Sequence, residues 1–221
     1  MVVTGGKGKD RDCSVWRGLA DVPSATGATR TDLSMKGFHM ARLPIQDVAG
    51  ATGSNKDIFA ALQKGLGMVP NMTRVMANSP AVLQAFAQFN GALGGAKLPT
   101  QIREQIALLT AESNACTYCL SAHTAIGKMI GLTQDQMDGA RHEESADPKT
   151  LAALHFAKSV LETRGGVDES DLRAVRAAGF GDAEIAEIVA TVALNVFTNY
   201  FNRAFDVDVD FPVVRAHHHA Q

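Results

Sequence analysis

From about Asn55 onward, apolar residues recur at intervals of three and four, which is the period of helices that bury one face. No stretch alternates apolar and polar residues as a half-buried strand would. The pattern therefore predicts an all-α protein. The longest segment lies between Asp182 and about Phe205, where apolar side chains cover much of the helix circumference. We expect this helix to be buried on several sides, partly against another subunit.

Small polar residues indicate where two consecutive helices begin. Thr100 is expected to cap a helix that runs to about Glu112. A second start follows at once, because Ser113 or Asn114 can cap another helix over residues 115–130. Two helices joined by so tight a turn should lie side by side as a hairpin. Further helix starts are expected after Ser79, Thr133 and Asp168.

The chain of 221 residues suits one domain with a tail rather than two domains. Residues 1–34 are rich in Gly, Ser, Thr, Asp and Arg and show no sustained period. We predict that they form a poorly ordered N-terminal tail and that residues 35–221 form the domain.

Charge and hydrophobicity narrow the classes of partner. The formal net charge is -2 and no Lys/Arg cluster is present, which argues against nucleic acid or an anionic membrane surface. No apolar run approaches the ~18 residues that span a bilayer, and the first dozen residues are too polar for a signal peptide. We therefore expect a cytoplasmic protein whose partners are small molecules or other proteins.

Two of the three cysteines, Cys116 and Cys119, stand three residues apart, and His123 follows one helical turn later. In a reducing compartment a C-x-x-C pair suggests redox chemistry rather than a structural crosslink. On one helix all three side chains share a narrow stripe, and the Cα separation of roughly 5 Å is one that a disulfide tolerates. If Ser113 or Asn114 is the cap, Cys116 lies in the first turn, where the positive end of the helix lowers its pKa, while His123 can move protons.

Glu104 is the leading candidate for a carboxylate partner of His123. On one uninterrupted helix it would lie roughly 18 Å from Cys116. If the chain folds back as a hairpin, Glu104 returns alongside the second helix and close to the imidazole. Glu112 is the competing carboxylate, but its place at the turn predicts a solvated side chain.

The stretch from Glu104 to His123, E-Q-I-A-L-L-T-A-E-S-N-A-C-T-Y-C-L-S-A-H, resembles the E-x11-C-x-x-C-x3-H signature of the AhpD-like alkylhydroperoxidases. That group belongs to the carboxymuconolactone decarboxylase superfamily. A looser similarity extends over residues 40–214 and includes the N-Y-F-N-R run at 199–203. The resemblance implies an all-helical bundle whose helix hairpin carries the C-x-x-C motif, assembled as a homotrimer or homohexamer. It also implies a dithiol that reduces hydroperoxides and is reduced by a thiol donor, such as a lipoyl protein or a peroxiredoxin, without a cofactor or a metal.

The same resemblance assigns roles to the four residues. Cys119 would be the peroxidatic cysteine, Cys116 the resolving cysteine and proton donor, and Glu104 with His123 the proton relay. The helix-dipole argument favours Cys116 as the more acidic thiol, so the two lines of reasoning differ, and we follow the family. The sequence departs from the best-known member at Tyr118, where that protein has a second histidine.

Three other interpretations stay open. The chain could be a thiol–disulfide relay that passes electrons to a peroxiredoxin, or a decarboxylase-type enzyme of the same superfamily that uses acid and base groups without thiols. A structural zinc site needs a fourth ligand, for which the distant candidates are His142, His155 and Cys13.

Several polar residues outside the motif have less specific interpretations. His155 and the run His217, His218 and His219 are expected to be largely solvated. A stripe of asparagines on the last predicted helix is either a polar face or a hydrogen-bonded subunit contact, and we favour the contact. Its members are Asn195, Asn199 and Asn202.

Overall fold

The computed structural model describes residues 41–217, so the predicted tail at 1–34 and the residues His218 and His219 lie outside the described range. Within this range the chain forms α-helices and no strand, which confirms the all-α prediction. The helices are α1 (Gly53–Leu66), α2 (Asn71–Met76), α3 (Pro80–Leu93), α4 (Thr100–Ser113), α5 (Thr117–Met129), α6 (Gln134–Arg141), α7 (Pro148–Thr163), α8 (Glu169–Ala177) and α9 (Asp182–Phe205).

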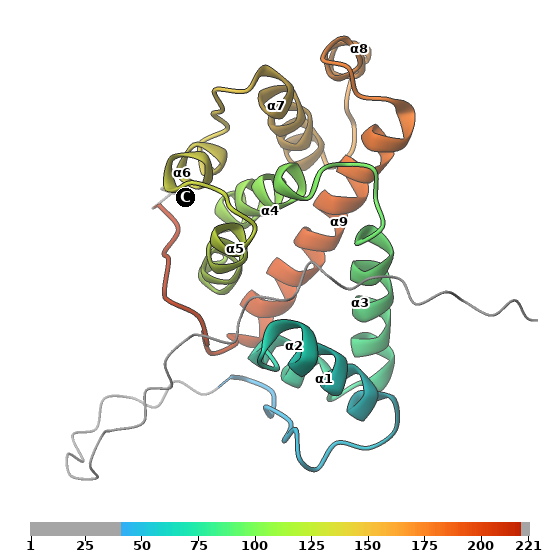
Figure 1. Cartoon of the computed structure of the whole chain (residues 1–221), viewed down its shortest axis with the longest axis vertical. Helices are drawn as coiled ribbons and strands as arrows, with labels where there is room; N and C mark the ends of the chain where they lie inside the picture. Colours follow the sequence, from blue (N-terminus) through green and yellow to red (C-terminus); the bar gives the residue numbers. More distant parts are fainter. Residues whose placement is uncertain (1–40, 218–221) are drawn as a thin grey trace, which may run out of the picture.

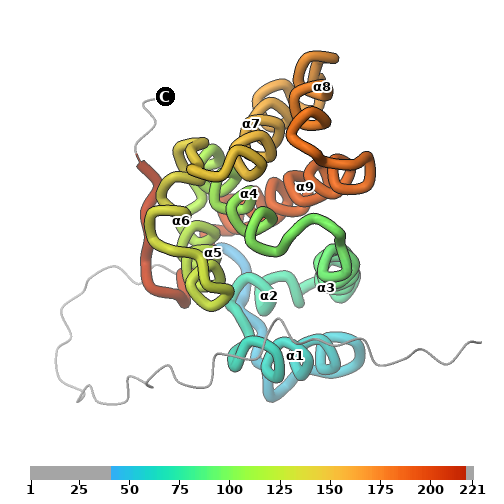
Figure 2. The backbone as a smooth tube through the Cα atoms, turned by 45° about the horizontal axis from the view of Figure 1, so that its top comes forward, coloured from blue at the N-terminus to red at the C-terminus, as the bar shows by residue number. Residues whose placement is uncertain are grey.

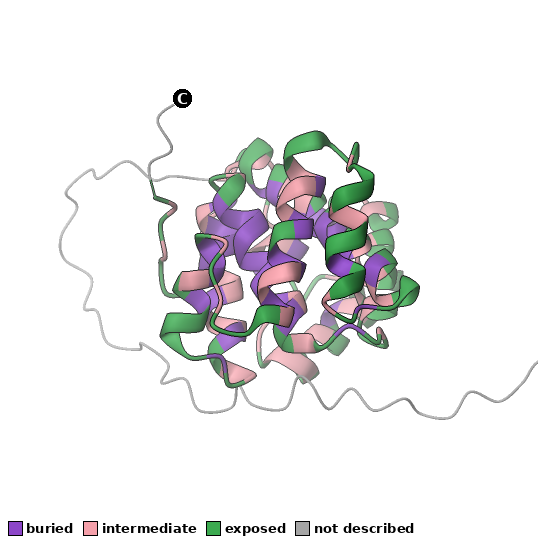
Figure 3. Cartoon of the chain, turned by 90° about the horizontal axis from the view of Figure 1, so that it is seen from above, coloured by how far each residue is buried: buried purple, intermediate pink, exposed green. Residues whose placement is uncertain are grey.

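Helices α4 and α9 cross at the centre of the bundle (Figure 1). Helix α4 packs against α5, α6, α7 and α9, and ten of its fourteen residues are buried. The sequence period had indicated a single buried stripe on this helix. Burial instead extends around the helix and includes the polar residues Glu104, Gln105 and Glu112, so each of them needs a partner inside the protein. Figure 3 shows the buried segments gathered at the centre of the bundle.

Two hydrophobic clusters hold the bundle together. The larger one lies around α4 and extends to α5, α6, α7 and α9. The smaller cluster contains Phe59, Met76 and Leu83, from α1, α2 and α3. Figure 2 shows these three helices grouped on one side of the molecule. Because Met72 and Phe201 contact both the smaller and the larger cluster, α2 and α9 join the two halves.

The predicted starts of α3, α4, α6 and α8 are correct to within one residue, whereas α5 begins at Thr117, two residues after its predicted start at 115. Asp168 caps α8 by accepting hydrogen bonds from two backbone N–H groups, and Thr133 forms a capping box at the start of α6. Ser79 occupies the N-cap of α3, but its side chain makes no capping hydrogen bond. Thr100 is the first residue of α4 rather than its cap, which is Pro99.

The C-terminal segment 206–217 leaves α9 and runs back along α5 and α6 (Figure 1). The hydroxyl of Ser121 accepts a hydrogen bond from the backbone N–H of Val214 at 2.9 Å. Arg141, on α6, donates to the carbonyl oxygen of Arg215 at 2.9 Å. The segment therefore forms a wall beside the N-terminal end of α5. None of the helices in the described range combines the length and the hydrophobicity that crossing a bilayer requires.

Candidate active site

A tight reversal between α4 and α5 positions the two cysteines. Ala115 adopts a left-handed backbone with φ of 49°, and the N–H of Cys116 donates to the carbonyl oxygen of Ala111 at 2.9 Å. This arrangement ends a helix as a Schellman motif, with alanine in the position that usually belongs to glycine. Ser113 and Asn114 therefore close α4. The prediction that one of them caps the next helix was wrong.

Cys116 itself is the N-cap of α5. Its Sγ accepts a hydrogen bond from the backbone N–H of Cys119 at 3.3 Å, and the two cysteines form a disulfide with a Cα–Cα distance of 5.3 Å. Both residues are buried, with exposed fractions of 1% and 2%. The pair thus lies at the positive end of the helix, where unpaired N–H groups favour negative charge on sulfur.

Glu104 and His123 meet across the hairpin. The distance from the carboxylate Oε1 of Glu104 to Nδ1 of His123 is 2.6 Å, and the side chains are 12% and 20% exposed. Burial alone would lower the pKa of His123, but the charge of Glu104 and its hydrogen bond outweigh this effect and raise the pKa above its ordinary value. The hairpin therefore brings together the carboxylate and the imidazole that the sequence had placed on separate helices.

The asparagines of α9 point into the chain. Asn195, Asn199 and Asn202 are 5%, 0% and 3% exposed, so the interpretation of this stripe as a subunit contact was wrong. Asn195 hydrogen bonds to His123, which also contributes to the raised pKa of the imidazole. The side-chain N–H of Asn202 donates to Sγ of Cys119 at 3.2 Å. The spacing i, i+4, i+7 was visible in the sequence, but nothing in it identified the hairpin as the surface that these residues face.

Asn202 has a second sulfur partner. Its Nδ2 also lies 3.2 Å from Sδ of Met72, while its Oδ1 is buried without a hydrogen-bond partner in the described part of the chain. A disulfide sulfur and a thioether sulfur only accept hydrogen bonds. The amide N–H₂ group therefore belongs on the side of the two sulfurs.

Tyr118, between the two cysteines, holds the C-terminal segment. Its hydroxyl donates to Oδ1 of Asp210 at 2.8 Å and accepts from the backbone N–H of Met72 at 3.1 Å, and its ring packs edge-on against Phe211. Burial and the nearby Asp210 charge raise the pKa of Tyr118. A neutral hydroxyl with both partners satisfied is an anchor, so this residue does not replace the histidine that the family's best-known member has here.

The sequence predicted a solvated side chain for Glu112, and this prediction was wrong. The residue is only 2% exposed. Its Oε2 accepts a hydrogen bond from Nε of Arg141 at 2.8 Å, and its Oε1 accepts one from the backbone N–H of His217 at 2.7 Å. The carboxylate therefore joins α4, α6 and the C-terminal segment. It is engaged in this contact, which leaves Glu104 as the carboxylate that the structure places on His123.

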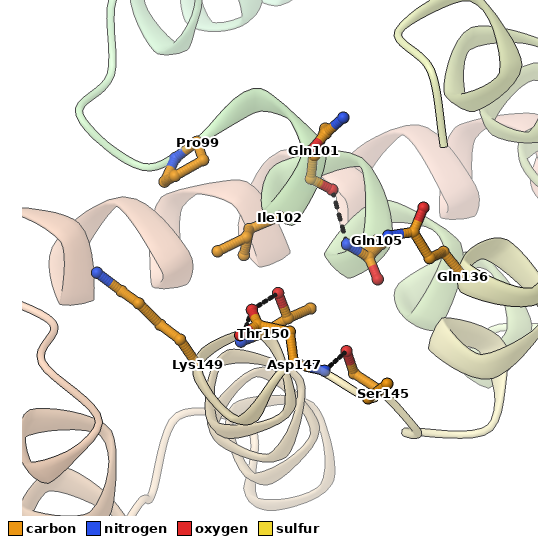
Figure 4. Close-up of a pocket in the computed structure, with 10 residues that line it drawn as sticks. Pro99, Gln101, Ile102, Gln105, Gln136, Ser145, Asp147, Lys149 and Thr150 are labelled. Atoms are coloured by element: carbon orange, nitrogen blue, oxygen red, sulfur yellow. Dashed lines mark hydrogen bonds between the residues drawn. The ribbon is translucent and has the colours of Figure 1, made fainter. Parts of the chain in front are cut away.

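Two cavities flank the bundle, and one of them reaches the disulfide. A cavity of about 530 Å³ is lined by Cys116, Thr117 and Asn202 together with the start of the C-terminal segment, and Cys119 does not line it. The other cavity, of about 590 Å³, lies between α4, α6 and α7 (Figure 4). Several of its polar groups already bind one another, as when Asp147 accepts from Thr150, and no cysteine lines it.

No group of three metal-ligating side chains is present within residues 41–217. Two candidates for a fourth zinc ligand lie beside other partners: the ring of His142 packs on that of His217 at 4.8 Å, and His155 lies 4.0 Å from Glu143. With the cysteines joined to each other, the described site is a dithiol–disulfide pair beside an imidazole and a carboxylate.

Comparison with known proteins gives one family model and several solved structures with the same fold. Residues 80–159 match the model of the carboxymuconolactone decarboxylase family. An uncharacterised peroxidase-related protein from Silicibacter sp. TM1040 superposes with a TM-score of 0.70 at 25% identity, covering 80% of this chain and 95% of that one. A protein from Ralstonia eutropha JMP134, described as an alkylhydroperoxidase AhpD core, gives 0.71 at 25% identity, with coverage of 77% and 93%.

A third solved structure shares the fold alone. It is a debrominase crystallised with 2,3,4-tribromopyrrole, with a TM-score of 0.65 at 22% identity over 80% of this chain and 94% of that one. A search of curated protein sequences finds no match. The comparisons and the hairpin geometry thus agree on one architecture.

Proposed function

The chain belongs to the AhpD-like carboxymuconolactone decarboxylase superfamily, and from that premise we propose that it is a thiol-dependent peroxidase. Its substrate is a hydroperoxide, and its electrons come from a thiol donor such as a lipoyl protein or a peroxiredoxin. The observation that carries the proposal is the disulfide-bonded pair Cys116 and Cys119 on the same hairpin as the 2.6 Å contact between Glu104 and His123. Electron transfer at sulfur needs proton transfer beside it, and this hairpin offers groups for both.

The proposed reaction has two oxidative steps. The Cys119 thiolate attacks one oxygen of the O–O bond, which breaks, so that a cysteine sulfenic acid forms and the alkoxide leaves as an alcohol after taking a proton. The thiol of Cys116 then displaces hydroxide from the sulfenic acid, which forms the disulfide and releases water. His123, held by Glu104, supplies and recovers protons in both steps.

We also propose that the protein acts as a homotrimer or homohexamer. Helix α9 exposes Val189, Phe197 and Tyr200, with exposed fractions of 41%, 40% and 57%. Large apolar side chains that gather on one helix in this way are typical of surfaces that bind another protein. Light scattering of the purified protein measures the subunit number, and a monomer at micromolar concentration would contradict this part of the proposal.

The test of the activity is hydroperoxide consumption with dihydrolipoamide as the donor. We expect Cys119→Ser and Cys116→Ser each to abolish turnover, because neither variant can form the disulfide. The matched control is Cys13→Ser, which removes the cysteine outside the motif and should turn over at the parent rate. If Cys119→Ser consumes peroxide as fast as the parent, the proposal is wrong.

The same assay separates the alternatives. A thiol–disulfide relay would exchange disulfides with its partner but consume negligible peroxide. A decarboxylase-type enzyme would keep its activity after both cysteines are alkylated. Either result would refute the peroxidase, because the proposed cycle needs both direct peroxide turnover and free thiols.

A further inference from the structure

The two sulfurs of the disulfide have different surroundings. Cys116 lines the cavity of about 530 Å³, whereas Cys119 does not line it and instead receives the hydrogen bond from Asn202. A cavity of this size accommodates a small molecule or the end of a flexible arm. We propose that this cavity is the docking site of the donor thiol, which attacks Sγ of Cys116 and expels Cys119 as the thiolate. This inference deepens the proposed peroxidase and depends on it for its biological role.

Each sulfur accepts a hydrogen bond, Cys116 from the backbone N–H of Cys119 at 3.3 Å and Cys119 from Asn202 at 3.2 Å, so the cavity selects the sulfur that is attacked and the bond from Asn202 favours the departure of Cys119. In thiol–disulfide exchange the sulfur with the more stable thiolate departs faster. Asn202 is 3% exposed, and its Nδ2 lies 3.2 Å from Sγ of Cys119, so the amide meets the developing negative charge with little competition from water. The cavity thus opens on the sulfur that is attacked, and the donor N–H group lies on the one that leaves.

Met72 keeps the amide in this orientation. A thioether accepts a hydrogen bond in every redox state, so the 3.2 Å contact from Nδ2 of Asn202 to Sδ of Met72 persists when the disulfide opens. If the amide flipped, its oxygen would face Sδ of Met72, and two acceptors cannot form a hydrogen bond with each other. With the N–H₂ group fixed towards Cys119, the thiolate of that residue accepts a stronger hydrogen bond than its thiol does, because a thiol sulfur is only a weak acceptor. This agrees with the family assignment of Cys119 as the attacking cysteine.

The electrons balance over two exchanges. A donor thiolate bonds to Sγ of Cys116, the Cys116–Cys119 bond breaks, and the electron pair of that bond goes to Cys119. A second donor thiol, or the other thiol of a dithiol, then attacks the donor sulfur of the mixed disulfide and releases Cys116. Two thiols become one disulfide of the donor, and the two cysteines take up two protons. The products of the two exchanges are therefore the reduced cysteine pair and the donor in its oxidised, disulfide form.

The cavity wall carries charges of both signs. Arg203 and Arg215 line it together with Asp206 and Asp208, so the donor meets polar groups on its way to the sulfur. Within residues 41–217 no ion pair involves either arginine, and both are exposed. A flexible arm with a thiol at its end and a polar backbone fits this chemistry better than an apolar substrate does.

The first test traps the mixed disulfide. The oxidised full-length protein is mixed with glutathione in the absence of peroxide, quenched with iodoacetamide within the first turnover, and digested for mass spectrometry. We expect glutathione on Cys116 and the alkyl group on Cys119 in most of the trapped molecules. Glutathione on Cys119 would overturn the proposal, as would an equal distribution between the two cysteines. Because no peroxide is present, the result does not depend on peroxidase activity.

The second test compares Asn202→Ala with the matched control Asn199→Ala. Asn199 is a buried asparagine of the same helix whose side chain accepts a hydrogen bond from Asn114 instead of contacting sulfur. Loss of a hydrogen bond to a charged group changes a rate or equilibrium constant by about ten- to a hundred-fold. We expect Asn202→Ala to slow reduction by dihydrolipoamide by about this factor. In the reduced Asn202→Ala variant, alkylation of Cys119 should also require a higher pH than it does in the parent.

The control should leave both the reduction rate and the pH profile at the parent values. A destabilised fold alone does not move the pH profile of a single cysteine, so the profile distinguishes a direct effect on the thiolate from a structural one. If Asn202→Ala and the parent share one profile, Asn202 does not stabilise the thiolate and the inference fails, whatever the peroxide assay shows.

Discussion

Replacing Glu104 with Gln removes the negative charge beside His123 and keeps the size of the side chain. The two groups are 2.6 Å apart and largely shielded from water, with exposed fractions of 12% and 20%. Two unit charges about 4 Å apart attract each other by about 4 kcal/mol at an effective dielectric constant of about 20. Desolvation offsets part of this attraction, and a Gln amide still accepts a hydrogen bond. We therefore expect a loss of about 2–3 kcal/mol in the free energy of unfolding near pH 6.

The loss should depend on pH with a definite sign. Burial lowers the pKa of His123, but Glu104 outweighs it, so the folded-state pKa is above the ordinary value of 6.5. A group whose pKa is raised on folding contributes its full stability below the unfolded pKa and loses it as the pH rises through the folded pKa. The difference between the parent and Glu104→Gln should therefore be largest between about pH 5 and 6 and should shrink in alkaline solution.

Urea unfolding of the oxidised protein at several pH values measures this difference. The matched control is Glu162→Gln, in which the carboxylate is 66% exposed and pairs with Lys158 on the surface of α7. We expect the control to change the free energy of unfolding by less than about 0.5 kcal/mol at every pH. A Glu104→Gln difference that is constant or grows with pH would show that His123 is not charged beside Glu104, and the proposed proton relay would lose its basis.

Three further substitutions test the supports of the site. Arg141→Met leaves the buried Glu112 without its 2.8 Å partner, so thermal unfolding should show a loss of about 3–5 kcal/mol. Tyr118→Phe removes the hydrogen bond to Asp210 and should cost about 1–3 kcal/mol in urea unfolding, while peroxide turnover per folded molecule stays within about two-fold. Ala115→Gly relieves the left-handed backbone at φ 49° and should raise the free energy of unfolding by about 0.5–1 kcal/mol; a loss would contradict the turn geometry.

Local sequence signals predicted much of the fold and the centre of the candidate site. The bounds of α9, Asp182 to Phe205, follow from its apolar period and coincide with the helix in the structure. The pairing of Glu104 with His123 required one further inference, that a turn near residue 114 reverses the chain. The spacing then brings the two side chains to the same level of the hairpin, where the structure has them in contact.

The cap of α5 escaped prediction because one alanine adopts an unusual backbone. Propensity assigns the left-handed position at a helix end to glycine or asparagine, so residue 115 gave no signal. Ser113 and Asn114 had the composition of caps and were chosen instead. Because Ala115 turns the chain, Cys116 becomes the N-cap of α5. Its sulfur accepts the hydrogen bond from the backbone N–H of Cys119 that a side-chain oxygen of Ser or Asn accepts at other N-caps.

The buried polar residues show why sequence periodicity alone could not complete the site. Glu112 and Asn202 look like surface residues in a helical pattern, because the pattern records polarity and not partners. Their partners lie 29 and 83 residues away, Arg141 for the first and Cys119 for the second. A buried polar group is tolerated when a tertiary contact satisfies it, and a tertiary contact has no period along the chain. The contacts of Glu112 with Arg141 and of Asn202 with Cys119 are therefore revealed only by the folded arrangement.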